Sequence, residues 1–209
     1  MTIGTNKIKP IETIYNGYRF RSRLEARWAV FFDAAGIRYE YEPQGFELYL
    51  NEKLGSIFYL PDFYLPQFNC YVEIKPLSIL EDGDALLDAS VRCVAMFNNI
   101  SCGSILCTGD PVDSRMVIGT NEDWPGETKF NISPCFFGER ITDLGREVNI
   151  FVYRKDVFGY PLLCNDKDNN PLPRVSPYGL YKSCFGEPRM LYGAKLKARQ
   201  ARFEHGEKP

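Results

Sequence analysis

Alternating apolar and polar residues predict short β-strands through the first half of the chain. Residues 11–20 alternate around Asn16-Gly17, a dipeptide typical of two-residue hairpin turns. Further β-rich runs follow at 37–42, 45–50, 57–65, 70–75 and 104–108. A turn-prone Pro-Gln-Phe-Asn step at 66–69 separates the third and fourth of these runs, so a second hairpin is expected there.

Two runs with helical spacing lie among these strands. The first covers residues 22–35, where Ser22 and Glu25 form a capping-box pattern and Gly36 is a typical helix stop. Its buried stripe is expected at Leu24, Trp28, Phe31, Phe32 and Ala35. The second helix is predicted over 78–97, with an apolar face at Leu80, Ala85, Leu86, Leu87, Val91, Val94, Ala95 and Phe97. A helix between the strands at 70–75 and 104–108 implies a parallel pair in a mixed sheet.

The second half of the chain has weaker patterns. Residues 109–147 are rich in Pro and Gly and are expected to be mainly loops. Strand-like runs are predicted at 148–153, 160–164 and 179–182, with a hairpin turn at 165–170 and a basic helix at 189–203. The expected division is a core at 1–110 and a loop- and β-rich elaboration at 111–209, which would select a substrate or partner or pack on the core. The predicted class is α/β, with helices on both faces of a mixed sheet and an appended β-rich C-terminal part.

Composition narrows the classes of protein that fit. A chain of 209 residues with 44% hydrophobic residues can bury one sizeable core. No apolar stretch is long enough to span a membrane and the N-terminus lacks an apolar signal region, so a cytoplasmic protein is expected. Seven scattered cysteines and one histidine favour reduced, mostly buried thiols over a disulfide framework or a zinc site. The net charge of −2 predicts no overall basic surface, although a local basic groove would suffice for binding nucleic acid.

Candidate chemistry lies in residues 57–76. Glu73 and Lys75 share one face of a strand because side chains alternate with period two, and a hairpin partner would bring Asp62 beside them. Two carboxylates on adjacent strands suit Mg²⁺ or Mn²⁺, which would lower the pKa of a water and offset charge on a phosphodiester. Lys75 would add positive charge where negative charge develops.

The alternative interpretation is an ordinary solvated strand face, since a Glu-x-Lys triplet is common. Glu127-Thr128-Lys129 has the same spelling. That triplet lies beside no buried apolar run and has no Pro-Asp step just before it. The context of Glu73 and Lys75 therefore distinguishes them from a chance pair.

The ordered motifs resemble the PD-(D/E)xK nuclease superfamily. Pro61-Asp62 is followed, after ten residues, by Glu73-Ile74-Lys75. The stretch from Phe20 to Ala29, Phe-Arg-Ser-Arg-Leu-Glu-Ala-Arg-Trp-Ala, is similar to the first helix of small phage and bacterial members and of the endonuclease subunit of heteromeric transposases. The resemblance covers about residues 12–110.

The resemblance implies a restriction-endonuclease-like core that cleaves DNA with Mg²⁺ or Mn²⁺. Asp62 and Glu73 would bind the metal, with the Ile74 backbone carbonyl as a further ligand, and Lys75 would position or activate the water. Glu25 would complete the site directly or through a water. A phage-type member would process phage DNA or attack host DNA in the host cytoplasm, alone, as a homodimer or with a partner protein.

Glu25 also has a purely structural interpretation. In a capping box its carboxylate would reach back to the backbone N–H of Ser22 and do nothing more. Residues expected to contact nucleic acid are Arg21, Arg23, Arg27, Lys195, Lys197, Arg199 and Arg202. For these basic residues the alternative is an ordinary solvated surface.

Two other functions remain open from the sequence. The chain could be a nuclease subunit that is active only with a partner. It could instead be a non-catalytic nucleic-acid or protein-binding module that kept the nuclease fold. The complete set of Glu25, Asp62, Glu73 and Lys75 argues against the module, because an inactive relative is expected to lose at least one of them.

Overall fold

The structure, a computed structural model, describes residues 10–100, 102–124, 127–142, 145–153, 158–161 and 189–203. This part of the chain forms a mixed α/β fold with a mixed sheet and three helices, as the sequence predicted at that level. Helix α1 spans Arg23–Ala35, α2 spans Gly83–Ile100 and α4 spans Tyr192–Gln200. Among the described residues, no helix has the length and apolar character needed to cross a membrane.

Local signals account for the first elements. Strands β1 (Thr13–Tyr15) and β2 (Tyr18–Phe20) pair around Asn16 and Gly17, whose φ angles are 47° and 84°. The Ser22 hydroxyl caps α1 by accepting a hydrogen bond from the Glu25 N–H, and Gly36 ends it at φ 75°. The predicted hairpin and helix are both confirmed, because each depends on residues close in sequence.

We expect Gly36→Ala to lower the free energy of unfolding by about 1 kcal/mol, because a Cβ at positive φ is strained. Open space surrounds Gly36, so the effect isolates the backbone conformation. Urea denaturation measures it. Gly83→Ala at the start of α2, where the added Cβ also meets nothing, is the matched control and should stay within about 0.5 kcal/mol or gain stability. Equal losses in both variants would contradict the assignment of strain to Gly36.

One nine-stranded sheet runs through the described part of the chain. Its order is β12-β11-β10-β9-β8-β7-β6-β3, with β13 paired to β10. The parallel pair is β7 with β8, as predicted from the helical crossover, and the other pairs are antiparallel. The bounds are β3 Glu40–Tyr41, β6 Phe63–Leu65, β7 Cys70–Lys75, β8 Gly103–Thr108, β9 Arg115–Trp124, β10 Glu127–Thr142, β11 Gly145–Tyr153, β12 Phe158–Pro161 and β13 Arg189–Met190.

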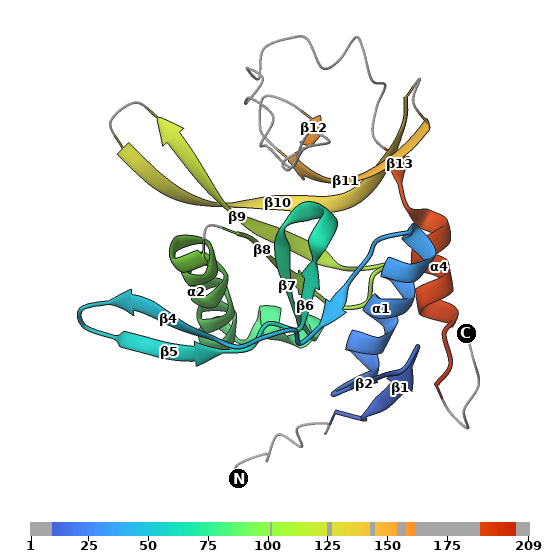
Figure 1. Cartoon of the computed structure of the whole chain (residues 1–209), viewed down its shortest axis with the longest axis horizontal. Helices are drawn as coiled ribbons and strands as arrows, with labels where there is room; N and C mark the ends of the chain where they lie inside the picture. Colours follow the sequence, from blue (N-terminus) through green and yellow to red (C-terminus); the bar gives the residue numbers. More distant parts are fainter. Residues whose placement is uncertain are drawn as a thin grey trace.

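A separate hairpin of β4 (Phe46–Asn51) and β5 (Gly55–Tyr59) projects beside α2 (Figure 1). Helix α2 covers one face of the central strands, while α1 and α4 lie together on the other side. Because side chains alternate along a strand, those of β7 point in turn toward one layer and the other. Val72 and Ile74 join the core under α1, and Glu73 turns toward the opposite face.

An aromatic core holds α1 against the sheet. Trp28, Phe32 and Phe63 are fully buried and make ring contacts with one another or with Phe137 on β10. The Trp28 indole N–H donates to the Gly109 carbonyl at 3.0 Å. Residues on both sides of position 110 thus share one hydrophobic cluster, while the division into a core and an elaboration at that position stays a prediction.

The expectation of a loop-rich 109–147 is wrong for the described residues, because β9 and β10 and the start of β11 lie there. β9 pairs with β8, and β10 pairs with β9 as far as Pro134 and with β11 from Cys135 onward. Proline cannot donate a ladder hydrogen bond, so it is compatible with this change of partner. The prolines and glycines of this region predict loops, because the sequence alone does not reveal which strand lies beside each segment.

Other element boundaries also differ from the predictions. The strand expected over 57–65 is broken between Tyr59 and Phe63, and the one over 37–42 shortens to Glu40–Tyr41. A 3-10 helix at Leu77–Glu81 precedes α2, and Leu87 is 63% exposed rather than part of the apolar face. The basic helix begins only at Tyr192, because Arg189–Met190 pair with β10.

Five of the seven cysteines lie among the described residues, where buried, reduced thiols are expected. Cys70, Cys93, Cys107 and Cys135 are buried and Cys102 is half-buried, all as free thiols. Burial raises the pKa of Cys93 to about 12, so this thiol keeps its proton. The predicted turn at 165–170 and strand at 179–182 lie outside the described residues, as do Cys164 and Cys184.

Candidate active site

The register of β6 and β7 brings Asp62 beside Glu73. Phe63 pairs with Val72, so the next position along each strand places Asp62 opposite Glu73. The Ile74 backbone N–H donates to Asp62 Oδ2 at 2.7 Å and locks this arrangement. Asp62 lies just before β6 rather than on a strand, which corrects the predicted continuous run. Pro61 cannot continue a ladder, so the chain leaves the β4–β5 hairpin here and enters the main sheet.

Glu73 and Lys75 share one face of β7, as the strand period predicted. The Lys75 ammonium donates to Glu73 Oε1, and the Tyr59 hydroxyl donates to Glu73 Oε2 at 2.6 Å. Burial lowers the pKa of Lys75, but the charge and hydrogen bond of Glu73 outweigh it, so the net direction is upward. Burial and the charge of Glu73 raise the pKa of Tyr59 well above its usual range. Both groups therefore keep their protons and act as donors to Glu73.

Glu25 lies buried in the first turn of α1. Its Oε1 accepts from the Ser22 hydroxyl at 2.7 Å, while Oε2 accepts from the Tyr41 hydroxyl at 2.6 Å and from the Arg21 backbone N–H at 3.1 Å. The expected capping box differs in one respect, because the carboxylate reaches the N–H of Arg21 rather than that of Ser22. Tyr41 comes from β3, so Glu25 also joins the helix to the sheet, which a capping box alone does not do.

Glu25, Glu42, Asp62 and Glu73 form an acid cluster, and Arg21 contacts the first three of them. Its guanidinium donates to Asp62 Oδ1 at 2.7 Å, and its Nε lies 2.6 Å from Glu42 Oε1. From the sequence, Arg21 is expected only to contact nucleic acid, and Tyr41, Glu42 and Tyr59 are not predicted parts of the site. Tyr41 and Glu42 lay in a strand-like run with no motif, and Tyr59 lay in an apolar strand, so no local signal pointed to them.

Asp62 and Glu73 concentrate negative charge in a buried place. They are 3% and 4% exposed, respectively. Burial, and then the charge of Glu73, raise the pKa of Asp62 to about 8, against the lowering by the Ile74 N–H and by Lys75. Glu25 is close enough to contribute in the same upward direction. A cation bound at this position would replace the proton of Asp62 and offset the repulsion between the two carboxylates.

The donor set fits a hard divalent cation. Among the described residues no group of three or more His, Cys, Asp or Glu side chains is arranged around one point. Mg²⁺ needs only one or two protein carboxylates, however, and Asp62 and Glu73 supply these. The N–H and C=O of a strand residue leave the same edge, so the Ile74 carbonyl faces the side on which its N–H meets Asp62. Arg21 and Lys75 already place positive charges on Asp62 and Glu73, as a metal ion would.

The basic residues predicted to contact nucleic acid divide into several environments. Arg27 on α1 and Arg199 on α4 both approach Asp110, at 3.4 and 3.7 Å, in the loop that follows β8. This loop adjoins the end of β7, since the Gly109 N–H donates to the Lys75 carbonyl at 2.8 Å. Two residues predicted to contact nucleic acid, from distant parts of the sequence, therefore meet at Asp110, in the loop that is bonded to the end of β7.

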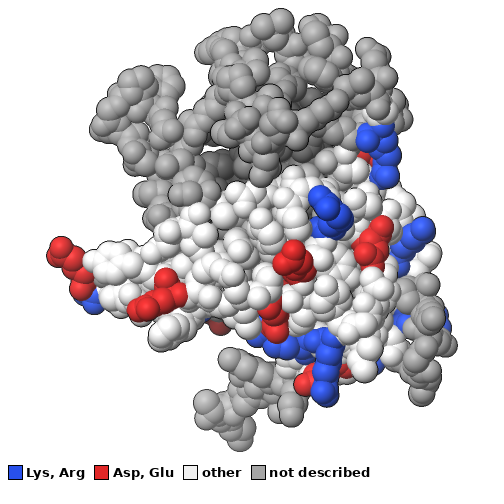
Figure 2. Space-filling model, in the orientation of Figure 1, with Lys and Arg blue, Asp and Glu red and all other residues white. Residues whose placement is uncertain are grey.

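The remaining basic residues differ in exposure. Lys195 is buried beside α1, and burial lowers its pKa, so its position does not support a contact with nucleic acid. Arg202 is exposed and Arg23 is half-buried. On the face shown in Figure 2, the basic side chains of the described residues lie mostly at the lower edge and on the right, with acidic ones among them, and these described residues form no single broad basic surface.

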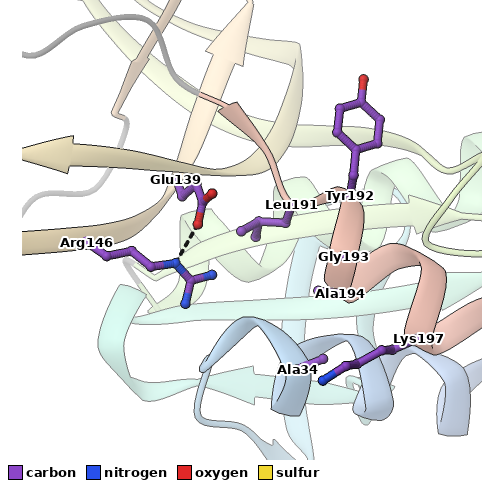
Figure 3. Close-up of a pocket in the computed structure, with 8 residues that line it drawn as sticks. All are labelled: Ala34, Glu139, Arg146, Leu191, Tyr192, Gly193, Ala194 and Lys197. Atoms are coloured by element: carbon purple, nitrogen blue, oxygen red, sulfur yellow. Dashed lines mark hydrogen bonds and ion pairs between the residues drawn. The ribbon is translucent and has the colours of Figure 1, made fainter.

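A pocket of about 420 Å³ lies at the other end of α1 from Glu25. Figure 3 shows Lys197 pointing toward Ala34, while Arg146 is engaged with Glu139. The residues that line it are Ala34, Glu139, Arg146, Leu191, Tyr192, Gly193, Ala194 and Lys197. None belongs to the acid cluster, so Lys197 does not line the candidate active site.

Comparison with known proteins adds no assignment. No protein-family model matches the chain, and neither the curated proteins nor the solved structures give a match.

Proposed function

We propose that this protein is a metal-dependent endonuclease that hydrolyses phosphodiester bonds in DNA, built on a restriction-endonuclease-like core. The observation that carries this proposal is the buried pair of Asp62 and Glu73, joined through adjacent strands, with Lys75 bonded to Glu73. The order of elements supports it. An N-terminal helix, short strands, a crossover helix and a parallel strand occur in the succession that the PD-(D/E)xK resemblance implies.

The residues divide the chemistry among them. A divalent cation at Asp62, Glu73 and the Ile74 carbonyl would supply positive charge to the phosphate and acidify a water. In hydrolysis, the oxygen of a water would bond to phosphorus and give up a proton to solvent, while the P–O bond to the leaving sugar oxygen would break and that oxygen would take up a proton. Because the pKa of Lys75 is raised, Lys75 stays protonated and donates to the phosphate rather than removing a proton from water.

Tyr59 and Glu25 shape this site without direct chemistry in our proposal. The Tyr59 hydroxyl fixes one oxygen of Glu73, which orients the other oxygen toward Lys75. Glu25 is fixed by Ser22, Tyr41 and the Arg21 N–H, so it adds negative charge at a set position. Contact between Glu25 and the cation would require its hydrogen bonds to rearrange.

The test is cleavage of supercoiled plasmid, linear duplex, single-stranded DNA and single-stranded RNA with Mg²⁺, Mn²⁺ or EDTA. We expect at least one DNA form to be cut with either cation and none with EDTA. If folded protein cuts no DNA form, the stand-alone endonuclease is wrong. Capture of a required partner would then distinguish a partner-dependent subunit from a binding module. Cutting of RNA alone would overturn the DNA assignment.

A further inference from the structure

Arg21 contacts more of the acid cluster than any motif residue does. Its side chain reaches Asp62 and Glu42, and its backbone N–H donates to Glu25 and to the Tyr41 hydroxyl, the latter at 3.0 Å. The contact with Asp62 is to Oδ1, whereas Ile74 takes Oδ2. Oδ1 is therefore the oxygen that an incoming cation would have to share with Arg21.

Glu42 holds the other side of the Arg21 guanidinium. Glu42 lies at φ 45°, a left-handed conformation that is strained for a residue with a Cβ. Its backbone N–H donates to the Asp62 carbonyl at 2.9 Å, which keeps this turn against the site. The Glu42 Oε1 atom is buried and has no hydrogen-bond donor among the described residues, although Arg21 Nε is its close ion-pair partner. A small movement of Arg21 would supply that donor.

We infer that Arg21 is a resident counter-ion that competes with the divalent cation for Asp62, and that Glu42 receives Arg21 when it leaves. The inference rests on the proposed function and deepens it, because it assigns the residues that set metal affinity. Arg21 can move at little cost, since its side chain is 56% exposed while that of Asp62 is 4% exposed. Held by Glu42, its guanidinium stays at the rim, where it can bind a phosphate oxygen.

The first measurement is Mn²⁺ affinity by calorimetry on the full chain, without DNA. We expect Arg21→Ala to bind Mn²⁺ about tenfold more tightly than the wild type, because a charge-assisted hydrogen bond no longer competes for Asp62. Glu42→Gln should bind about threefold more weakly, because an Arg21 that leaves Asp62 then meets a neutral amide oxygen instead of a charged carboxylate. Arg19→Ala, which removes an arginine paired with Glu12 on the N-terminal hairpin, is the matched control and should leave the affinity unchanged.

The double variant separates competition from a general change of charge. If Glu42 acts through Arg21, then adding Glu42→Gln to Arg21→Ala should alter Mn²⁺ affinity far less than it does in the wild type. Additive effects would overturn this coupling, and an affinity in Arg21→Ala equal to or weaker than that of the wild type would overturn the competition. A second readout guards against misfolding. Saturating Mn²⁺ should raise the Tm of Arg21→Ala and of the wild type, but not that of Asp62→Asn.

Cleavage kinetics complete the test, because a released Arg21 should contact the substrate. Arg21→Ala should raise KM for DNA and shift metal activation to lower Mn²⁺ concentration, whereas Arg19→Ala should change neither. If the wild type binds Mn²⁺ and cuts DNA but Arg21→Ala binds no more tightly, only this inference fails. If the wild type binds no Mn²⁺ and cuts nothing, the proposed function fails with it.

Discussion

Replacing Lys75 with alanine is expected to lower the rate of DNA cleavage about 10³-fold at saturating Mg²⁺. Lys75 is the one positively charged side chain among the predicted catalytic residues, and its ammonium contacts Glu73 directly. Its raised pKa keeps it charged, so removal would take away the donor that we propose for the developing negative charge. Single-turnover cleavage of plasmid measures the effect. In the variant Glu73 keeps only the Tyr59 hydroxyl as a donor, so circular dichroism is needed to verify that the variant folds like the wild type.

The control for Lys75 comes from the chain itself. Lys129 ends the second Glu-x-Lys triplet and lies on β10, where its register partner is Glu122 on β9. Lys129→Ala removes the same charge from the same motif spelling and should retain wild-type cleavage. Loss of activity in both variants would mean that Lys75 acts through general charge. Retained cleavage in Lys75→Ala would remove it from the catalytic machinery.

Asp62→Asn is expected to abolish cleavage and yet stabilise the protein at pH 8 by about 1–3 kcal/mol. The folded-state pKa of Asp62 is raised to about 8 from an unfolded value near 3.8. The folded state therefore binds more protons than the unfolded state between about pH 4 and pH 8, and wild-type stability falls as pH rises through this window. Asparagine lacks this titration but can still accept a hydrogen bond from the Ile74 N–H.

Urea denaturation in EDTA at pH 5 and pH 8 measures this difference. The stability gap between Asp62→Asn and the wild type should widen toward pH 8, and Mn²⁺ should narrow it by stabilising the wild type alone. Glu52→Gln, at an exposed position in the β4–β5 turn, is the control and should show no such pH dependence. A variant that is less stable than the wild type at pH 8 would show that Asp62 supports the fold rather than burdening it.

The two expected results together describe a site in which function and stability oppose each other. Asp62 and Glu73 repel each other in a buried place, and Arg21 and Lys75 offset only part of that repulsion. The acids are held together by the β6–β7 register and by the Ile74 N–H, which are contributions of the sheet. Such an arrangement is expected where binding of a cation supplies the missing stabilisation.

Short-range rules were sufficient for several features of this chain. The Asn16-Gly17 turn, the Ser22 cap and the Gly36 stop each depend on neighbouring residues, and each lies where the sequence predicted it. The common face of Glu73 and Lys75 follows from the strand period alone, and the parallel pair follows from the helix between its strands. These features required no knowledge of distant partners.

Other features depended on which distant segments meet. Arg21 became part of the acid cluster because β3 and the turn before β6 fold against the start of α1, and nothing local distinguished it from Arg23 or Arg27. Residues 115–124 and 127–142 became strands because β8 offered an edge for pairing, despite their Pro and Gly. Lys195 turned inward because α4 packs on α1. The sequence determined the local elements and the order of the motif, whereas long-range pairing and burial decided which charges share the site.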